Sequence, residues 1–376
     1  MNVWIDNKAY QPQNHAEACK NLGIENPEQP HMQGFLPSII LDRHQPTAIN
    51  ALADFEDSYV GAALNAEEVG LGKTIETIGL LLHRLNQRKS AIEEERPVEG
   101  ALPTLIILPQ NLIQQWKTEI FQFTDAFKVL IYYGPPRKSG DEKITYIPKS
   151  VNKGRLTRSH ELFNGNEENA NTIVITSYAT YTARHGPNVQ WKWLVDERKK
   201  KLKRDGQTAT KRAAEVSLDE DGIRCHSVHE ECPHQLHGLF ERVILDEGHT
   251  IRHQSDDVGF AVSNIGSRYR HILSGTPIFD NIDEFAGIMR FLQNLVLGQK
   301  EHLLEMGFSE RELTTGSHER PGKVTPLESV VYFCDPYSLA DGNVKTPLRF
   351  TSEAMQRDLF NKLYNKGKGF GTEEQG

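Results

Sequence analysis

The chain has 376 residues, with 43 Lys or Arg against 51 Asp or Glu, which gives a formal net charge of −8 at pH 7. This balance excludes a wholly basic nucleic-acid coat protein, but locally placed Lys and Arg can still bind phosphates. The longest apolar runs are strand-sized, and the first residues lack a basic segment followed by an apolar one, so we expect neither a membrane span nor a secretory signal. Four cysteines in so long a chain do not form a disulfide framework, which favours a reducing compartment.

The amino-terminal part of the chain contains two helical patterns separated by a short apolar run. Residues 1–35 are polar and contain prolines, and we expect a loose arm or an irregular cap there. Apolar residues then recur at helical spacing over 41–54 and again over 74–88. Between these patterns, residues 60–66 are small and apolar and end in a glycine-rich loop. The order predicts a strand, a loop and a helix.

Farther along the chain, short β-branched runs alternate with helical segments. Near-continuous apolar strands of this kind are typical of a parallel sheet that is buried on both faces. We therefore expect an α/β fold with a mainly parallel central sheet and helices on both faces. Sites in such sheets lie beyond the carboxyl ends of the strands. The predicted strands are 104–108, 128–132, 172–176, 242–245 and 269–273.

Two stretches interrupt this alternation. Residues 184–238 form a long insertion with a basic run at 198–204. The polar, lysine-rich part of the insertion cannot form a buried strand at an acceptable desolvation cost, so we expect it to be an accessory to the sheet. Residues 301–376, rich in Gly, Pro and Thr over 309–350, are expected to be a partial extension of a main lobe at 36–300.

Three features of the insertion each allow two interpretations. The basic run could be a nuclear import signal or a contact to DNA phosphates, although a solvated helix or loop is the plainer interpretation. Trp191 and Trp193 could stack on bases, but they more often anchor such an insertion to the domain. A Cys/His cluster could form a tetrahedral zinc site, yet it lacks a Cys-x-x-Cys pair and packing is favoured. Its members are Cys225, His226, His229, Cys232, His234 and His237.

The strongest local signal is the segment 67–74, Glu-Glu-Val-Gly-Leu-Gly-Lys-Thr, between the first predicted strand and a predicted helix. Glycines in this context let backbone N–H groups turn inward, and the helix N-terminus adds its dipole, which together cradle phosphates. Lys73 would neutralise the β- and γ-phosphates, and the Thr74 hydroxyl would bind Mg²⁺. The alternative is an ordinary glycine-rich turn.

A second candidate motif follows the predicted strand 242–245. Asp246 stands at the strand tip, where it could hold Mg²⁺, and Glu247 could orient the attacking water. His249 could link the nucleotide state to another element. Alone, the segment is more typical of an acidic strand-to-loop turn, but a phosphate loop on the same parallel sheet supports the catalytic interpretation.

The ordered motifs resemble the first RecA-like lobe of the Swi/Snf-type ATPases, a branch of helicase superfamily two. The resemblance covers residues 36–293, and six motifs in the family's order are far more specific than any one. The family's phosphate loop also starts with an acidic pair, as Glu67 and Glu68 do here. This chain departs from the pattern at His44, where tyrosine is usual, and at Gly248, where alanine is usual.

The resemblance implies a role for each motif. Nucleotide contacts are implied for the upstream adenine-recognition motif and the phosphate loop, at Arg43, Gln45, Glu68, Gly70, Leu71, Gly72, Lys73 and Thr74. Contacts to the DNA backbone are implied for two further motifs, at Pro109, Gln115, Trp116, Thr176, Ser177 and Tyr178. A motif that couples hydrolysis to DNA is matched by Ser274, Gly275 and Thr276, followed by Pro277, Asn281, Glu284, Phe291 and Leu292. Phe279 and Asp280 replace the family's polar pair.

Taken together, the resemblance implies a RecA-like P-loop domain that uses ATP and Mg²⁺ and binds duplex DNA, with nucleosomes as a further candidate partner. A nuclear location and a role in chromatin remodelling or DNA repair follow from it as expectations. No second set of motifs follows residue 300, so we expect full activity to need a second RecA-like lobe from elsewhere.

Two other classes of function compete with this one. The chain could be a catalytically silent module that docks on DNA or protein, derived from such a motor by truncation. The intact Lys73, Thr74, Asp246 and Glu247 favour retained nucleotide chemistry instead. A small-molecule P-loop kinase is disfavoured, because it would not explain the Gln-Trp segment at 115–116 or the Ser-Gly-Thr-Pro segment at 274–277.

Overall fold

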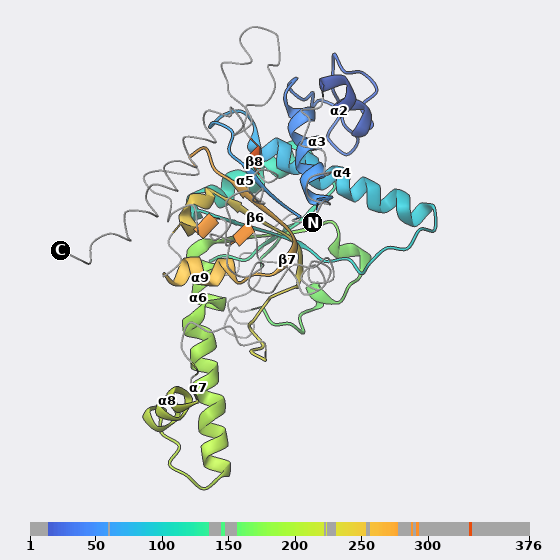
Figure 1. Ribbon diagram of the computed structural model, residues 1–376. Helices are drawn as coiled ribbons and strands as arrows, with labels where there is room; N and C mark the ends of the chain where they lie inside the picture. The colour runs from blue at the N-terminus through green and yellow to red at the C-terminus, as the bar shows by residue number, and fades with distance from the viewer. Residues whose placement is uncertain are drawn as a thin grey trace, which may run out of the picture.

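The computed structural model describes residues 14–58, 61–134, 144–146, 156–221, 223, 231–252, 256–276, 287–288, 291–292 and 331–332 (Figure 1). Its centre is an eight-stranded sheet in the order β4-β3-β5-β2-β6-β7-β1-β8, and every pairing is parallel. The strands are β1 (Ala62–Asn65), β2 (Thr104–Leu108), β3 (Lys128–Ile131), β4 (Ile144–Tyr146), β5 (Thr172–Ser177), β6 (Phe240–Asp246), β7 (Ser267–Leu273) and β8 (Val331–Tyr332). The predicted parallel α/β fold is confirmed.

Strand β2 shows why the sheet is covered on both faces. All five of its residues are buried. Leu105 and Ile107 belong to one hydrophobic core, whereas Ile106 and Leu108 belong to the other. Successive side chains of a strand point to opposite faces, so a strand that is apolar throughout needs a helical layer on each side.

The helices supply those two layers. One core is shared with α2 (His15–Asn21), α4 (Lys73–Glu93) and α5 (Ile113–Phe123), through residues that include Cys19, Ile78, Leu82, Leu85, Trp116 and Ile120. The other is shared with α6 (Tyr178–His185) and α9 (Asp257–Ser263), through residues that include Tyr178, Tyr181, Ala261 and Val262. No helix of the described residues is long and apolar enough to cross a membrane.

The amino-terminal residues from 14 onward form a packed cap. Leu22, Met32 and Phe35 are buried in the core that α4 covers, and the Thr124 hydroxyl donates to the Gly34 carbonyl at 2.6 Å. The described part of the predicted arm is therefore a cap and not a loose segment.

The insertion forms a helical hairpin that extends away from the sheet (Figure 1). The hairpin is formed by α7 (Pro187–Arg204) and α8 (Lys211–Glu220), which enclose a small core of Val195, Leu202, Ala214 and Leu218. Trp191 packs against this core, within the hairpin itself. Among the described residues, the insertion contributes no strand to the sheet, and β6 is the next strand after β5 in the chain.

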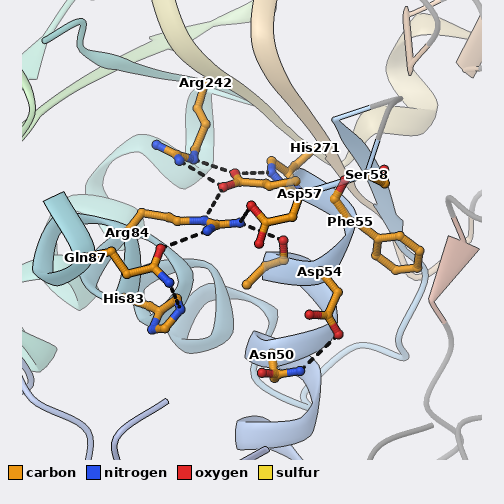
Figure 2. Close-up of polar contacts among 12 residues, drawn as sticks. Asn50, Asp54, Phe55, Asp57, Ser58, His83, Arg84, Gln87, Arg242 and His271 are labelled. Carbon is orange, nitrogen blue, oxygen red and sulfur yellow. Dashed lines mark hydrogen bonds and ion pairs between the residues drawn. The ribbon is translucent and has the colours of Figure 1, made fainter. Parts of the chain in front are cut away.

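A buried ionic cluster fixes α3 (Gln45–Glu56) against the sheet and α4. Figure 2 shows the labelled side chains of Arg84, Arg242 and His271 converging on one carboxylate. The ion pairs of these three side chains identify that carboxylate as Glu56. Glu56 is fully buried and accepts from Arg84 Nε at 2.8 Å, Arg242 Nη2 at 2.9 Å and His271 Nε2 at 2.8 Å. Burial alone would raise the pKa of Glu56, but the charge of Arg242 and the hydrogen bonds outweigh it and hold the pKa below its ordinary value.

Candidate active site

The phosphate-loop segment connects β1 to α4 at the carboxyl edge of the sheet, as predicted. Gly70 and Gly72 have φ values of +94° and +104°, a region that residues with a Cβ rarely adopt. A Cβ on Gly72 would lie 2.5 Å from Gln45 Nε2, whereas one on Gly70 would meet nothing within 4 Å. The loop therefore needs glycine at Gly72 for space and conformation, and at Gly70 for conformation alone.

Lys73 and Thr74 stand at the first turn of α4. The Lys73 ammonium donates to the carbonyl oxygens of Glu67 and Glu68, at 2.9 Å each. These oxygens hold the positive charge at the mouth of the loop, where phosphate oxygens could replace them as acceptors. Thr74 is half-buried, and its hydroxyl has no hydrogen-bond partner among the described residues, so it is free to serve as a ligand.

The start of α3 lies directly against this loop. His44 Nε2 donates to the Leu71 carbonyl at 2.8 Å, and Gln45 Nε2 donates to the same oxygen at 3.4 Å. Gln45 also accepts from the Asp42 N–H at 2.9 Å, and both His44 and Gln45 are buried. Of the predicted adenine-recognition residues, Gln45 thus supports the loop and Arg43 is exposed beside it. The contact made by His44 had no signal in the sequence.

A buried carboxyl pair lies beneath the loop, and sequence reasoning missed it. Glu67 and Glu76 are both fully buried. Asn65 joins them, because its side chain donates to Glu76 at 3.0 Å and accepts from the Glu67 N–H at 3.1 Å. Burial raises the pKa of Glu67, and burial together with the charge of Glu67 raises that of Glu76 well above its ordinary value. Burial thus opposes the accumulation of negative charge next to the candidate phosphate loop.

Asp246 ends strand β6, which is separated from β1 only by β7. Its Oδ1 accepts from the Glu247 N–H at 2.9 Å, and its Oδ2 accepts from Trp116 Nε1 at 2.7 Å. Burial raises the pKa of Asp246, while the hydrogen bond from Trp116 and the charge of Lys73 oppose that rise. The position of Asp246 at the same edge of the sheet as the loop after β1 fits two motifs that serve one site.

Glu247 has a left-handed backbone, with φ +50° and ψ +47°. Such a conformation is uncommon for a residue with a Cβ and is often found at functional positions. It turns the chain sharply after β6 and leaves the Glu247 side chain partly exposed, with Oε2 3.3 Å from His249 Nδ1. Gly248 is buried, and a Cβ there would collide with Ile272 of β7. The glycine in place of the family's usual alanine therefore has a packing reason.

The described part of the coupling motif lies between the two other motifs. The Ser274 N–H donates to the Asn65 carbonyl at 3.0 Å, at the start of the phosphate loop. The Ser274 hydroxyl is hydrogen-bonded to His249 Nδ1 at 3.3 Å and accepts from the Thr276 N–H at the same distance. Gly275 packs against Val69 of the loop. The following candidates Pro277, Phe279, Asp280, Asn281 and Glu284 lie outside the described residues.

The predicted DNA-contact residues divide into surface and interior positions. Gln115 is exposed and Pro109 is half-buried. In contrast, Trp116, Thr176, Ser177 and Tyr178 are 2%, 0%, 2% and 5% exposed. Thr176 donates to the Tyr132 carbonyl at 2.8 Å, and Ser177 caps α6 by accepting from the Thr180 N–H at 3.1 Å. Side chains buried to this degree are not presented to a nucleic acid.

The Cys/His cluster is only partly described. Cys232 is buried, and His237 Nδ1 accepts a hydrogen bond from the Gly266 N–H at 3.1 Å. This bond gives His237 a structural role. Cys225, His226 and His229 lie outside the described residues. The rest of the described chain holds no group of three or more His, Cys, Asp or Glu side chains suited to a metal ion.

A parallel sheet with a phosphate loop after β1 and an acidic pair after β6 defines a RecA-like P-loop domain. A family model described as the SNF2-related domain matches residues 44–331, and the chain belongs to this family. The matched segment contains strands β1 to β7 and the first residue of β8.

Three curated relatives match this chain at 24–27% identity. The chain is 26% identical over 296 residues to the TATA-binding protein-associated factor MOT1 of Saccharomyces cerevisiae, covering 77% of this chain and 12% of that protein. It is 27% identical over 289 residues to the DNA repair protein RAD5 of Candida glabrata, covering 70% and 20%. It is 24% identical over 292 residues to the helicase SWR1 of Eremothecium gossypii, covering 77% and 14%. The chain therefore spans a fifth or less of these relatives.

Among solved structures, the SWI2/SNF2 ATPase core of Sulfolobus solfataricus in complex with dsDNA aligns with 95% of this chain and 55% of that chain. The TM-score is 0.40 and the sequence identity is 15%.

Proposed function

We propose that this chain is the ATP-binding lobe of a DNA-dependent ATPase or translocase of the Swi/Snf type. The observation that carries the proposal is the convergence of three motifs at one edge of the sheet. Ser274 contacts Asn65 at the end of β1, just before the phosphate loop, and the acidic motif through His249. The adjacent Gly275 lies against Val69 of the loop. A lone glycine-rich turn or a lone acidic turn would need no such link.

Each residue at this edge then has a defined task. Lys73 neutralises the β- and γ-phosphates of ATP, and the loop N–H groups bind their oxygens. Glu247 holds and orients the attacking water, since its partly exposed carboxylate follows the strand tip. His249 passes the state of the site to Ser274 through their hydrogen bond.

The residues present also fit a magnesium ion. Mg²⁺ prefers carboxylate and hydroxyl oxygens and keeps several waters. Asp246 offers a carboxylate, and the Thr74 hydroxyl has no competing partner within the described part of the chain. When bound, the ion supplies positive charge to the phosphate oxygens, and Thr74 and Asp246 would hold it.

We further propose duplex DNA as the partner, bound through its phosphates and without sequence readout. Surface residues such as Gln115 and the backbone around Pro109 are the candidate contacts. The names of the relatives support this assignment, since they include a DNA repair protein and a TATA-binding protein-associated factor. A nuclear location, and nucleosomes as a substrate, extend the same proposal.

Full activity should require a second RecA-like lobe. In motors of this class the nucleotide lies between two lobes, and the second supplies arginines to the transition state. An arginine supplied in this way is worth about 10³–10⁵ in rate. Hydrolysis by this lobe alone should therefore be slow and translocation absent.

The test is hydrolysis of radiolabelled Mg-ATP by excess protein, with and without duplex DNA, for the wild type and Glu247→Gln. We expect slow turnover that falls about 100-fold or more in the variant, while ATP binding is retained. Glu241→Gln, at the amino end of the same strand, is the matched control and should behave as the wild type. Unchanged turnover in Glu247→Gln would remove Glu247 from the mechanism. ATP binding without any turnover in the wild type would instead favour a silent module.

A further inference from the structure

The acidic motif is held in place by two buried donors that come from opposite faces of the sheet. Trp116 Nε1 donates to Asp246 Oδ2 at 2.7 Å, and the Tyr178 hydroxyl donates to the Asp246 carbonyl at 2.8 Å. Trp116 belongs to the core under α4 and α5, whereas Tyr178 belongs to the core under α6 and α9. Side chain and backbone of the same residue are thus fixed by separate helical layers.

Each donor is the immediate neighbour of an exposed residue in its helix. Trp116 follows the exposed Gln115 in α5, and Tyr178 precedes the exposed Ala179 in α6. Adjacent Cα atoms are fixed 3.8 Å apart, so a displacement of either helix end on DNA binding must also displace the neighbouring donor residue. The interior is close-packed and transmits such displacements.

Breaking either of the two hydrogen bonds to Asp246 costs free energy. An indole N–H has one proton to donate and no capacity to accept. A buried donor left without an acceptor is disfavoured. When α5 or α6 moves, the low-energy response is for Asp246 to move with its partners.

We propose that Trp116 and Tyr178 are positioning residues that couple DNA contact at α5 and α6 to the placement of the Asp246 carboxylate. The inference rests on the proposed function and adds a route by which DNA changes the affinity for Mg-ATP. It also replaces the predicted role of these two side chains as direct DNA contacts, which their burial opposes.

The experiment measures the dissociation constant of Mg-ATP with and without saturating duplex DNA, in the wild type and in three variants. Tyr178→Phe removes only the hydroxyl, Trp116→Phe removes the indole N–H, and the third variant combines them. Matched controls are Tyr181→Phe in the same helix and Trp191→Phe in the hairpin. A parallel series without Mg²⁺ isolates the contribution of the metal-binding carboxylate.

In the wild type we expect DNA to change Mg-ATP affinity by about 5-fold or more, the range usual for coupled sites. Each single variant should reduce this factor, and the double variant should bring it below about 2-fold. The two controls should keep the wild-type factor, and the DNA effect should disappear without Mg²⁺. By linkage, Mg-ATP must change DNA affinity by the same factor.

Three results would overturn the inference. One is a double variant that keeps the full DNA-dependent factor. Another is loss of DNA binding by Tyr178→Phe without nucleotide, which would make Tyr178 a direct contact. A third is a wild-type affinity that DNA does not change, which would leave the ATP-binding function intact. If the wild type bound no Mg-ATP, the proposed function would fall as well.

Discussion

Replacing Glu56 with Gln is the sharpest test of what holds α3 against the phosphate loop and the sheet. The substitution keeps the size of the side chain and removes its charge. It leaves Arg242, which is 7% exposed, and the largely buried Arg84 facing an amide with one acceptor oxygen. Removing one partner of a buried ion pair costs about 3–5 kcal/mol, because the other charge stays desolvated.

The expected loss of unfolding free energy is therefore about 3–5 kcal/mol, measured by urea denaturation followed by circular dichroism. Domains of about 150–250 residues lose roughly 2–4 °C of Tm per kcal/mol, so Tm should fall by roughly 6–20 °C. Glu167→Gln is the matched control, because Glu167 is 56% exposed in its pair with Arg88. An exposed pair of this kind is worth about 0–1 kcal/mol.

The same substitution changes how the free energy of unfolding depends on pH in the acid range. The pKa of Glu56 in the folded protein lies below its ordinary value of 4.5. The stabilisation by ionised Glu56 is thus complete above that value and is lost as the pH falls below it. The wild type should lose stability over this acid range more steeply than Glu56→Gln. A variant within about 1 kcal/mol of the wild type at pH 7 would refute the reasoning.

Three further outcomes follow from the geometry. DNA affinity should fall steeply with salt, because phosphate contacts release counterions; a strong preference for one base sequence at fixed salt would contradict phosphate binding. Gly72→Ala should weaken Mg-ATP binding in calorimetry by about tenfold or more, and more than Gly70→Ala, because only at Gly72 do strain and a collision with Gln45 combine; equal affinities of the two variants would count against the loop geometry. Limited trypsin digestion should cut first near Arg204 or Lys211, which border the exposed connection between α7 and α8; a first cut within β5 or β6 would argue against the domain layout.

The strands could be predicted because their signal is local. Residues 104–108 are apolar or β-branched throughout, and the structure places β2 at the same bounds. The phosphate loop was predictable for a similar reason, since glycines between a strand and a helix leave few alternatives. The polarity of the insertion excluded a buried strand, but its helical hairpin was missed. Its signal is the helical spacing of Trp191, Val195 and Leu202.

The contacts that refine the site could not be predicted, because they join residues far apart in the chain. Trp116 and Asp246 are 130 positions apart, and nothing near Trp116 indicates that its indole faces inward. Glu67 looks like an exposed loop residue until the fold places it beneath the loop beside Glu76. The partners of Glu56 come from a helix and two strands, so only the assembled sheet identifies them.

The central claim, that this chain binds Mg-ATP through its phosphate loop, is tested most directly by calorimetry of the wild type and Lys73→Ala. Charge-assisted contacts from this lysine to phosphate would be worth about 1.5–3 kcal/mol, which corresponds to roughly a 10- to 150-fold loss of affinity in the variant. The fold should persist, because Lys73 is half-buried at the start of α4 and its ammonium contacts, among the described residues, only the carbonyl oxygens of Glu67 and Glu68. Saturable binding by the wild type with this loss in the variant is the predicted result. Equal affinity in the two proteins would contradict the claim.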